Sequence, residues 1–128
     1  MRQLLAILVT ALSLTTSNAQ VFVGTNNSDT STIFSFSVGA TATNLAVTLN
    51  GSSSAYSYLM LKQGSAPTDT IYDYSSQDAG KTNGIYLELP EVTPGTYWVR
   101  VRTPAASQVH AFNLLIETNK NNLRTQSR

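Results

Sequence analysis

The sequence predicts an all-β protein: a single small antiparallel β-sandwich of about six to eight strands, jelly-roll-like, that follows an N-terminal signal peptide. Three observations support this prediction. Short segments alternate apolar and polar residues with the period of two that a half-buried strand requires. Turn-forming residues separate these segments at intervals of roughly ten residues. Beyond the N-terminal segment, no helical period is sustained for more than a turn.

The N-terminus has the three parts of a signal peptide. Met1 and Arg2 give a positive start, Leu4 to Leu14 is an apolar run, and a small polar exit follows. Ser17 and Ala19 have the spacing that signal peptidase reads, which predicts cleavage after Ala19 and a secreted or periplasmic protein. A membrane anchor or a buried helix is the alternative, but a run of about eleven residues is too short to span a bilayer, which needs roughly 20.

The sequence divides into four parts. We expect residues 1–19 to be the signal peptide and 20–31 a polar lead-in, with room for a short strand at Val21 to Val23. Residues 32–117 form the sandwich, and 118–128 form a flexible basic tail or a truncated linker. A mature chain of about 109 residues fits one domain.

The first three strands of the sandwich are expected at residues 33–38, 44–49 and 56–62. The first two turn their bulkiest apolar residues to the core: Phe34, Phe36, Val38, Leu45, Val47 and Leu49. In the third strand both phases are fairly apolar, so both stay open. The preferred phase places Leu59 and Leu61 inward and leaves Tyr58, Met60 and Lys62 outward.

Four further strands are expected at residues 71–74, 85–89, 96–102 and 110–117. A loop that ends in Asn83-Gly84 precedes the second of these, and Pro94-Gly95 sets the turn before the third. The expected inward residues are Ile85, Leu87, Leu89, Tyr97, Val99, Val101, Phe112, Leu114 and Ile116.

The clearest alternation provides a candidate binding surface. Opposite the inward face of strand 96–102, it places Trp98, Arg100 and Arg102 on the outer face. Neighbouring strands are expected to add Tyr86, Tyr58 or Asn113, and aromatic and Arg side chains concentrate binding energy. Two alternatives stay open: the Trp ring lies over the sheet with the Arg stems covering apolar surface, or it is buried against a neighbouring domain.

Composition excludes several function classes. Up to Glu117, and after Arg2 has been removed, four cations stand against seven acids, a net charge of about −3, which argues against nucleic acid as a partner. The chain has no cysteine, so it has neither disulfides nor thiol chemistry, and a lipid-modified N-terminus is excluded. A secreted chain without cysteine is typical of bacterial export.

The sequence gives no catalytic or metal site. His110 is the single histidine, no Gly-x-Ser-x-Gly motif exists, and we expect His110 to be a surface or edge residue. Asp69, Asp73 and Asp78 do not have the spacing of an EF-hand loop and are expected to serve turns. We therefore predict no enzyme activity, no metal and no cofactor.

Three segments resemble the bacterial pre-peptidase C-terminal domain, a small β-sandwich attached to secreted proteases and other exported proteins. They are residues 33–38, residues 58–67 followed by Tyr72-Asp73, and residues 95–101; the resemblance spans about residues 32–117. One departure is clear, because Ala55-Tyr56-Ser57 stands where the family usually has acidic residues. Some relatives bind calcium near their N-terminal linker, where this chain offers only Asp29, and calcium needs six to eight oxygens. Because this region has so few carboxylates, we expect no calcium site here.

The resemblance implies a secreted, non-catalytic accessory or binding module. Such a module attaches to a polysaccharide or a matrix protein, stands alone as a small adhesion protein, or accompanies an attached catalytic domain. A structural spacer or partner domain of a larger secreted protein, without a ligand of its own, is the alternative. A small hydrolase is the third interpretation, and nothing in the sequence favours it.

Overall fold

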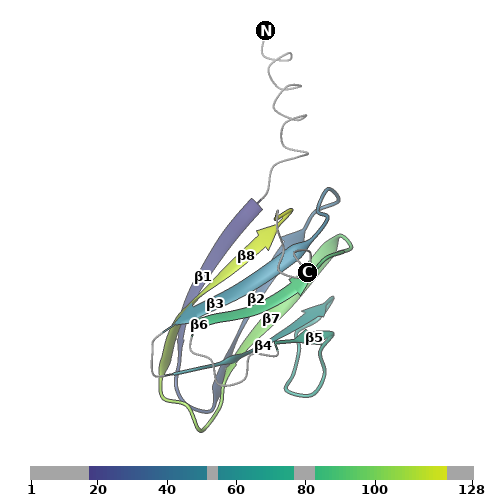
Figure 1. Cartoon of the computed structure of the whole chain (residues 1–128). Coiled ribbons are helices and arrows are strands. Elements are labelled where there is room, and N and C mark those ends of the chain that lie inside the picture. The colour runs from purple at the N-terminus through teal and green to yellow at the C-terminus, as the bar shows by residue number, and fades with distance from the viewer. Residues whose placement is uncertain (1–17, 52–54, 77–82, 121–128) are drawn as a thin grey trace.

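The computed structural model describes residues 18–51, 55–76 and 83–120. Within them the chain forms eight strands and no helix, and these strands build two antiparallel four-stranded sheets (Figure 1). In chain order the strands are β1 (Asn18–Asn26), β2 (Thr30–Val38), β3 (Leu45–Gly51), β4 (Tyr58–Gln63), β5 (Tyr74–Ser75), β6 (Asn83–Leu89), β7 (Gly95–Thr103) and β8 (His110–Thr118). The predicted all-β sandwich is confirmed.

The chain alternates between the two sheets. The first sheet has the order β1-β8-β3-β6, and the second has the order β2-β7-β4-β5. Consecutive strands therefore change sheet at every step except from β4 to β5. As a result β1 and β2 are edge strands on one side of the sandwich, and β6 and β5 are edge strands on the other.

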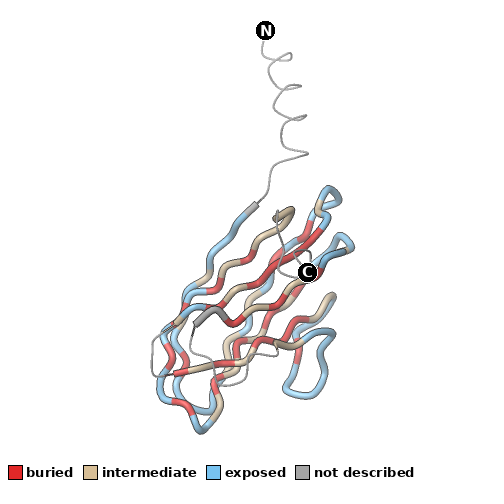
Figure 2. Tube along the Cα trace, in the orientation of Figure 1, coloured by how far each residue is buried: buried red, intermediate tan, exposed pale blue. Residues whose placement is uncertain are grey.

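Alternate side chains of both sheets meet in one core, as period two requires. All the residues expected inward are buried there except Phe34, which is partly buried and packs against the core. Leu59 and Leu61 are fully buried, which settles the phase of β4 as preferred. Figure 2 shows the resulting alternation of red with paler segments along the strands.

The largest differences from the predicted strands are at β1 and β5. The expected lead-in contributes most of β1, a nine-residue strand that pairs with the whole of β8, and the turn into β2. The strand expected at 71–74 is shorter and later, at Tyr74–Ser75. Gly64 follows β4 with a φ of 90°, a conformation that glycine adopts most readily, and turns the chain into the loop that precedes β5.

Most of the predicted signal peptide, residues 1–17, lies outside the described residues, as do Asp78, Lys81 and residues 121–128. In the part of the chain that the structure describes, no helix is long and apolar enough to cross a membrane.

Candidate functional site

The second sheet gathers most of the predicted binding residues on its outer face, the face turned away from the core. Trp98, Arg100 and Arg102 alternate along β7 with the buried residues of that strand. On β4, Lys62 lies directly opposite Trp98, and Tyr58 lies opposite Arg102. Four of the five predicted site residues therefore share one face.

Tyr86 does not join them. It lies on β6 in the first sheet, opposite Thr48 of β3, and Asn113 on β8 also belongs to that sheet. The ammonium group of Lys120 lies 5.6 Å from the centre of the Tyr86 ring, a cation–π distance. The expectation that Tyr86 would stand beside Trp98 is therefore wrong, because the two residues belong to different sheets.

Arg100 and Arg102 both form ion pairs with acidic residues of the same chain. Arg100 Nη2 lies 3.0 Å from Asp69 Oδ1, and Arg102 Nε lies 3.9 Å from the same oxygen. Arg102 also donates a hydrogen bond to Asp29, in the turn before β2. Asp69 belongs to the loop between β4 and β5, so its two ion pairs with Arg100 and Arg102 hold that loop against the outer face.

Trp98 is not an open platform. Its side chain is partly buried, and its indole Nε1 is shielded from solvent with no hydrogen-bond partner among the described residues. Met60, predicted to face outward, lies on this face opposite Arg100 and is buried. This arrangement agrees with the alternative in which the Trp ring lies over the sheet while the Arg stems cover apolar surface.

The open aromatic surface lies beside this closed patch, at the β5 edge. Ile71, Tyr72 and Tyr74 have exposed fractions of 61%, 41% and 47%. The loop from residue 64 to β5 is pale blue along most of its length in Figure 2. These side chains are exposed because β5 is only two residues long, so no regular strand turns them alternately inward.

Two hollows flank this edge, and Tyr72 lines both. The outer hollow measures about 330 Å³ and is lined by Tyr58, Leu59, Met60, Asp69, Tyr72, Ser75, Ser76, Arg102 and Pro104. The side groove measures about 820 Å³ and is lined by Gln63, Tyr72, Asp73, Tyr74, Leu89, Glu91, Val92, Thr93 and Tyr97. We call Tyr58, Tyr72 and Tyr74 the tyrosine edge.

Hydrogen bonds preorganise the loop that carries the tyrosine edge. Thr68 Oγ1 accepts from the backbone N–H of Ile71 at 2.9 Å, and the N–H of Thr68 donates to the carbonyl of Ile71 at 2.9 Å. Asp73 Oδ2 accepts from the N–H of Gln63, and the N–H of Asp73 donates to Leu61. A ligand would therefore meet a largely preformed surface, which lowers the entropy lost on binding.

The chemistry of this edge suits ring stacking with hydrogen bonding. Its phenol rings offer flat faces, and its carboxylates accept hydrogen bonds: Asp69 at the outer hollow, Asp73 and Glu91 at the side groove. Arg102 places one cation, already paired with acids, at the outer hollow.

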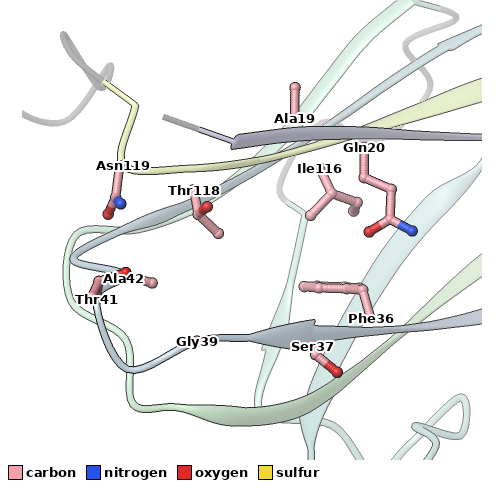
Figure 3. Close-up of a pocket in the computed structure, with 10 residues that line it drawn as sticks. All are labelled: Ala19, Gln20, Phe36, Ser37, Gly39, Thr41, Ala42, Ile116, Thr118 and Asn119. Carbon is pink, nitrogen blue, oxygen red and sulfur yellow. The ribbon is translucent and has the colours of Figure 1, made fainter. Parts of the chain in front are cut away.

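A third hollow lies at the end of the sandwich near the start of β1 (Figure 3). It measures about 220 Å³, and none of the described residues that line it is titratable. Phe36 and Ile116 form its apolar wall, and Gln20, Thr118 and Asn119 are among its polar lining residues. Ala19, after which cleavage is expected, also lines it, so processing would change its shape.

His110 corrects another expectation, because it is fully buried rather than a surface or edge residue. Its Nδ1 lies 2.6 Å from Ser57 Oγ, which lies 2.6 Å from Thr103 Oγ1. Burial lowers the pKa of His110 below its ordinary value of 6.5. The sequence contained the signal, because His110 stands two residues before Phe112 and continues the inward alternation of β8.

This buried pair does not form a catalytic arrangement. Ser57 has no exposed surface, and the partners of its hydroxyl are Thr103 and His110 rather than a substrate-facing group. No carboxylate is hydrogen-bonded to His110 among the described residues, whereas a triad needs one to orient the base. Among the described residues there is also no group of three or more His, Asp or Glu side chains that could hold a metal ion.

Comparison with known proteins identifies the family of this chain. The protein-family model described as "Bacterial pre-peptidase C-terminal domain" matches residues 30–103. No curated protein matches the chain in sequence.

Solved structures share the fold. A periplasmic inhibitor of g-type lysozyme, PliG from Aeromonas hydrophila, has a TM-score of 0.61 at 14% identity, covering 80% of this chain and 87% of its own. The mitogen from Yersinia pseudotuberculosis has a TM-score of 0.53 at 14% identity, covering 84% and 91%. The pre-peptidase C-terminal domain of a Bacillus anthracis collagenase has a TM-score of 0.50 at 18% identity, covering 80% and 88%.

Proposed function

The chain belongs to the bacterial pre-peptidase C-terminal domain family, and from this premise we propose that it is a non-catalytic binding module that acts outside the cytoplasm. The proposed binding site is the tyrosine edge, and the proposed ligand is an extracellular polysaccharide or a protein polymer. The family is one of accessory domains rather than catalytic ones, which supports the non-catalytic part of the proposal.

One observation carries the choice of site. Tyr72 and Tyr74 have 41% and 47% of their surface exposed. Tyr72 lines both hollows, and Tyr74 lines the side groove. The segment that carries them is held by its own hydrogen bonds. Exposed aromatic groups clustered over hollows mark interaction sites, whereas single exposed apolar residues do not. Trp98, the strongest candidate from sequence, contributes less because it is partly covered.

Export supports the same function. The signal peptide predicted at residues 1–19 would direct the chain out of the cytoplasm. One protein of similar fold is named as a periplasmic inhibitor, which is consistent with this location. A polymer outside the cytoplasm is thus a ligand that the module would meet.

Retention on insoluble polymers tests the proposal. The purified module is mixed with cellulose, chitin, peptidoglycan and collagen, and the bound fraction is measured over a range of protein concentrations. We expect retention on at least one polymer, and at least tenfold weaker binding of the double variant Y72A/Y74A, because central aromatic residues each contribute more than about 1 kcal/mol. The control is V109A, which removes exposed apolar surface from the loop before β8.

Two results would contradict the proposal: no retention of the unaltered module on any polymer, or equal retention of the module and Y72A/Y74A. Circular dichroism of the double variant would show that the sandwich is still folded. Since Tyr72 and Tyr74 lie outside the core, we expect it to be.

A spacer or partner domain is the second candidate, and the closed outer face favours it. Arg100 and Arg102 already have acidic partners within the chain, and Trp98 is partly covered. A spacer needs no ligand, so it predicts that Y72A/Y74A changes no retention. It predicts instead that the module lies next to a catalytic domain in a longer chain, which the reading frame beyond Arg128 would reveal.

A further inference from the structure

The β1 edge of the first sheet is long and regular. β1 is nine residues long and pairs with β8 in continuous register, without a bulge. Among the described residues, no strand pairs with its other edge. An edge of this length presents a row of backbone N–H and C=O groups that can hydrogen-bond to a further strand.

Edge strands usually carry a device that prevents such pairing: a charge, a proline, a bulge or a very short length. β5 is two residues long, and β6 contains Glu88. β1 has none of these devices, since its sequence NAQVFVGTN contains neither a charged residue nor a proline. β2, the edge strand beside it in the other sheet, is also uncharged.

The side chains of β1 add an apolar stripe to this open edge. Phe22 faces inward and stacks on Phe34, with ring centres 4.8 Å apart. Val21 and Val23 therefore point to the outer face, where 60% and 73% of their surface is exposed. Leu115 of β8 lies directly opposite Val21 and continues the stripe.

We propose that two copies of this chain associate through antiparallel pairing of their β1 strands, joining two first sheets into one continuous sheet. A second copy fits because the side chains of the edge are neutral, so two identical edges approach without like-charge repulsion between opposed side chains. In this antiparallel pairing the amino group of each processed chain lies at the opposite end of the contact from that of its partner. The contact is also isologous, and a two-fold contact closes after one pairing instead of growing into a fibre.

Expected processing fixes the register. Cleavage after Ala19 leaves β1 with Gln20 to Asn26, and the residue at the centre of this segment is Val23. Full pairing about a two-fold axis therefore places Val23 opposite Val23 of the second copy, and Val21 opposite Thr25. One strand pair is small beside the roughly 1,600 Å² of a standard interface, so we expect a weak dimer that forms at high micromolar concentration.

Sedimentation velocity of the processed protein, over roughly 10 to 1,000 µM, tests the proposal. The unaltered protein should shift from monomer to dimer. Val23→Lys should weaken the association at least tenfold by placing two ammonium groups opposite each other, and Val109→Lys, which adds the same charge at another exposed valine, should leave it unchanged. A monomer throughout, or an equal dimer with Val23→Lys, would overturn the proposal.

Cross-linking tests the register independently, because the chain has no cysteine of its own. Directly opposed residues of an antiparallel pair have Cα atoms about 4.5 or 5.5 Å apart, within disulfide range. Val23→Cys should form a disulfide-linked dimer under mild oxidation faster than Val21→Cys or Val109→Cys. Equal rates for the three variants would exclude this pairing, even if Val23→Lys did not fold.

Discussion

His110 makes a pH-dependent contribution to stability that can be isolated, because it is the only histidine in the chain. It is fully buried, and burial lowers its pKa below 6.5. The unfolded chain therefore binds a proton on this residue at a higher pH than the folded chain does. Stability is complete above pH 6.5 and falls as the pH drops from 6.5 towards the lowered pKa of the folded state.

The size of this effect follows from linkage. Each pH unit in that window costs up to about 1.4 kcal/mol, so the free energy of unfolding should fall by up to about 1.4 kcal/mol between pH 7.5 and pH 5.5. The structure adds a physical reason for the penalty, since Nε2 of His110 is buried without a hydrogen-bond partner among the described residues.

Urea unfolding at pH 7.5, 6.5 and 5.5 measures the effect, with H110N as the comparison because its side chain stays neutral and can still hydrogen-bond to Ser57. We expect the pH slope to disappear in H110N, whatever its overall stability. The NMR signal of the single imidazole gives a direct reading in the unaltered protein. A midpoint at or above pH 6.5, or the same slope in H110N, would refute the reasoning.

Three further outcomes are expected. Leu61→Ala should lower the free energy of unfolding in urea by about 2–5 kcal/mol, because it opens a cavity in the core. Gly51→Ala should destabilise by more than the roughly 1–3 kcal/mol of ordinary overpacking, because its Cβ would lie 2.0 Å from His110 Nε2; an unchanged melting temperature would contradict this. Asp69→Asn should change the free energy of unfolding by less than about 1 kcal/mol, since Asp69 is half exposed. It should also weaken the ion pairs that hold the β4–β5 loop against the outer face, so acrylamide should quench the fluorescence of Trp98 on that face more strongly.

Local alternation was sufficient for predicting the core. Every residue expected inward on β3, β6, β7 and β8 is buried, because a period of two fixes the face without knowledge of the strand order. His110 follows the same rule, and the error came from setting the alternation of β8 aside for a general expectation about histidine.

The site depended on information that is not local. Whether Tyr86 stands beside Trp98 is decided by strand order, and the order β1-β8-β3-β6 separates them. The pairing of Arg100 with Asp69 joins residues far apart in the sequence. The exposure of Tyr72 and Tyr74 follows from the two-residue length of β5, which the sequence of the segment that begins at Ile71 does not reveal.

The two proposed surfaces lie at opposite edges of the sandwich, because β1 and β5 are edge strands on different sides (Figure 1). Pairing of two copies through β1 would therefore leave both tyrosine edges free and facing away from each other. Such a dimer binds a polymer at two points, and linked sites raise the overall affinity by roughly 10²–10⁴-fold without any new contact. At protein concentrations where the unaltered chain is dimeric, V23K should then lose most of its retention on a polymer surface while each site keeps its affinity for a short soluble fragment, whereas Y72A/Y74A should lose both.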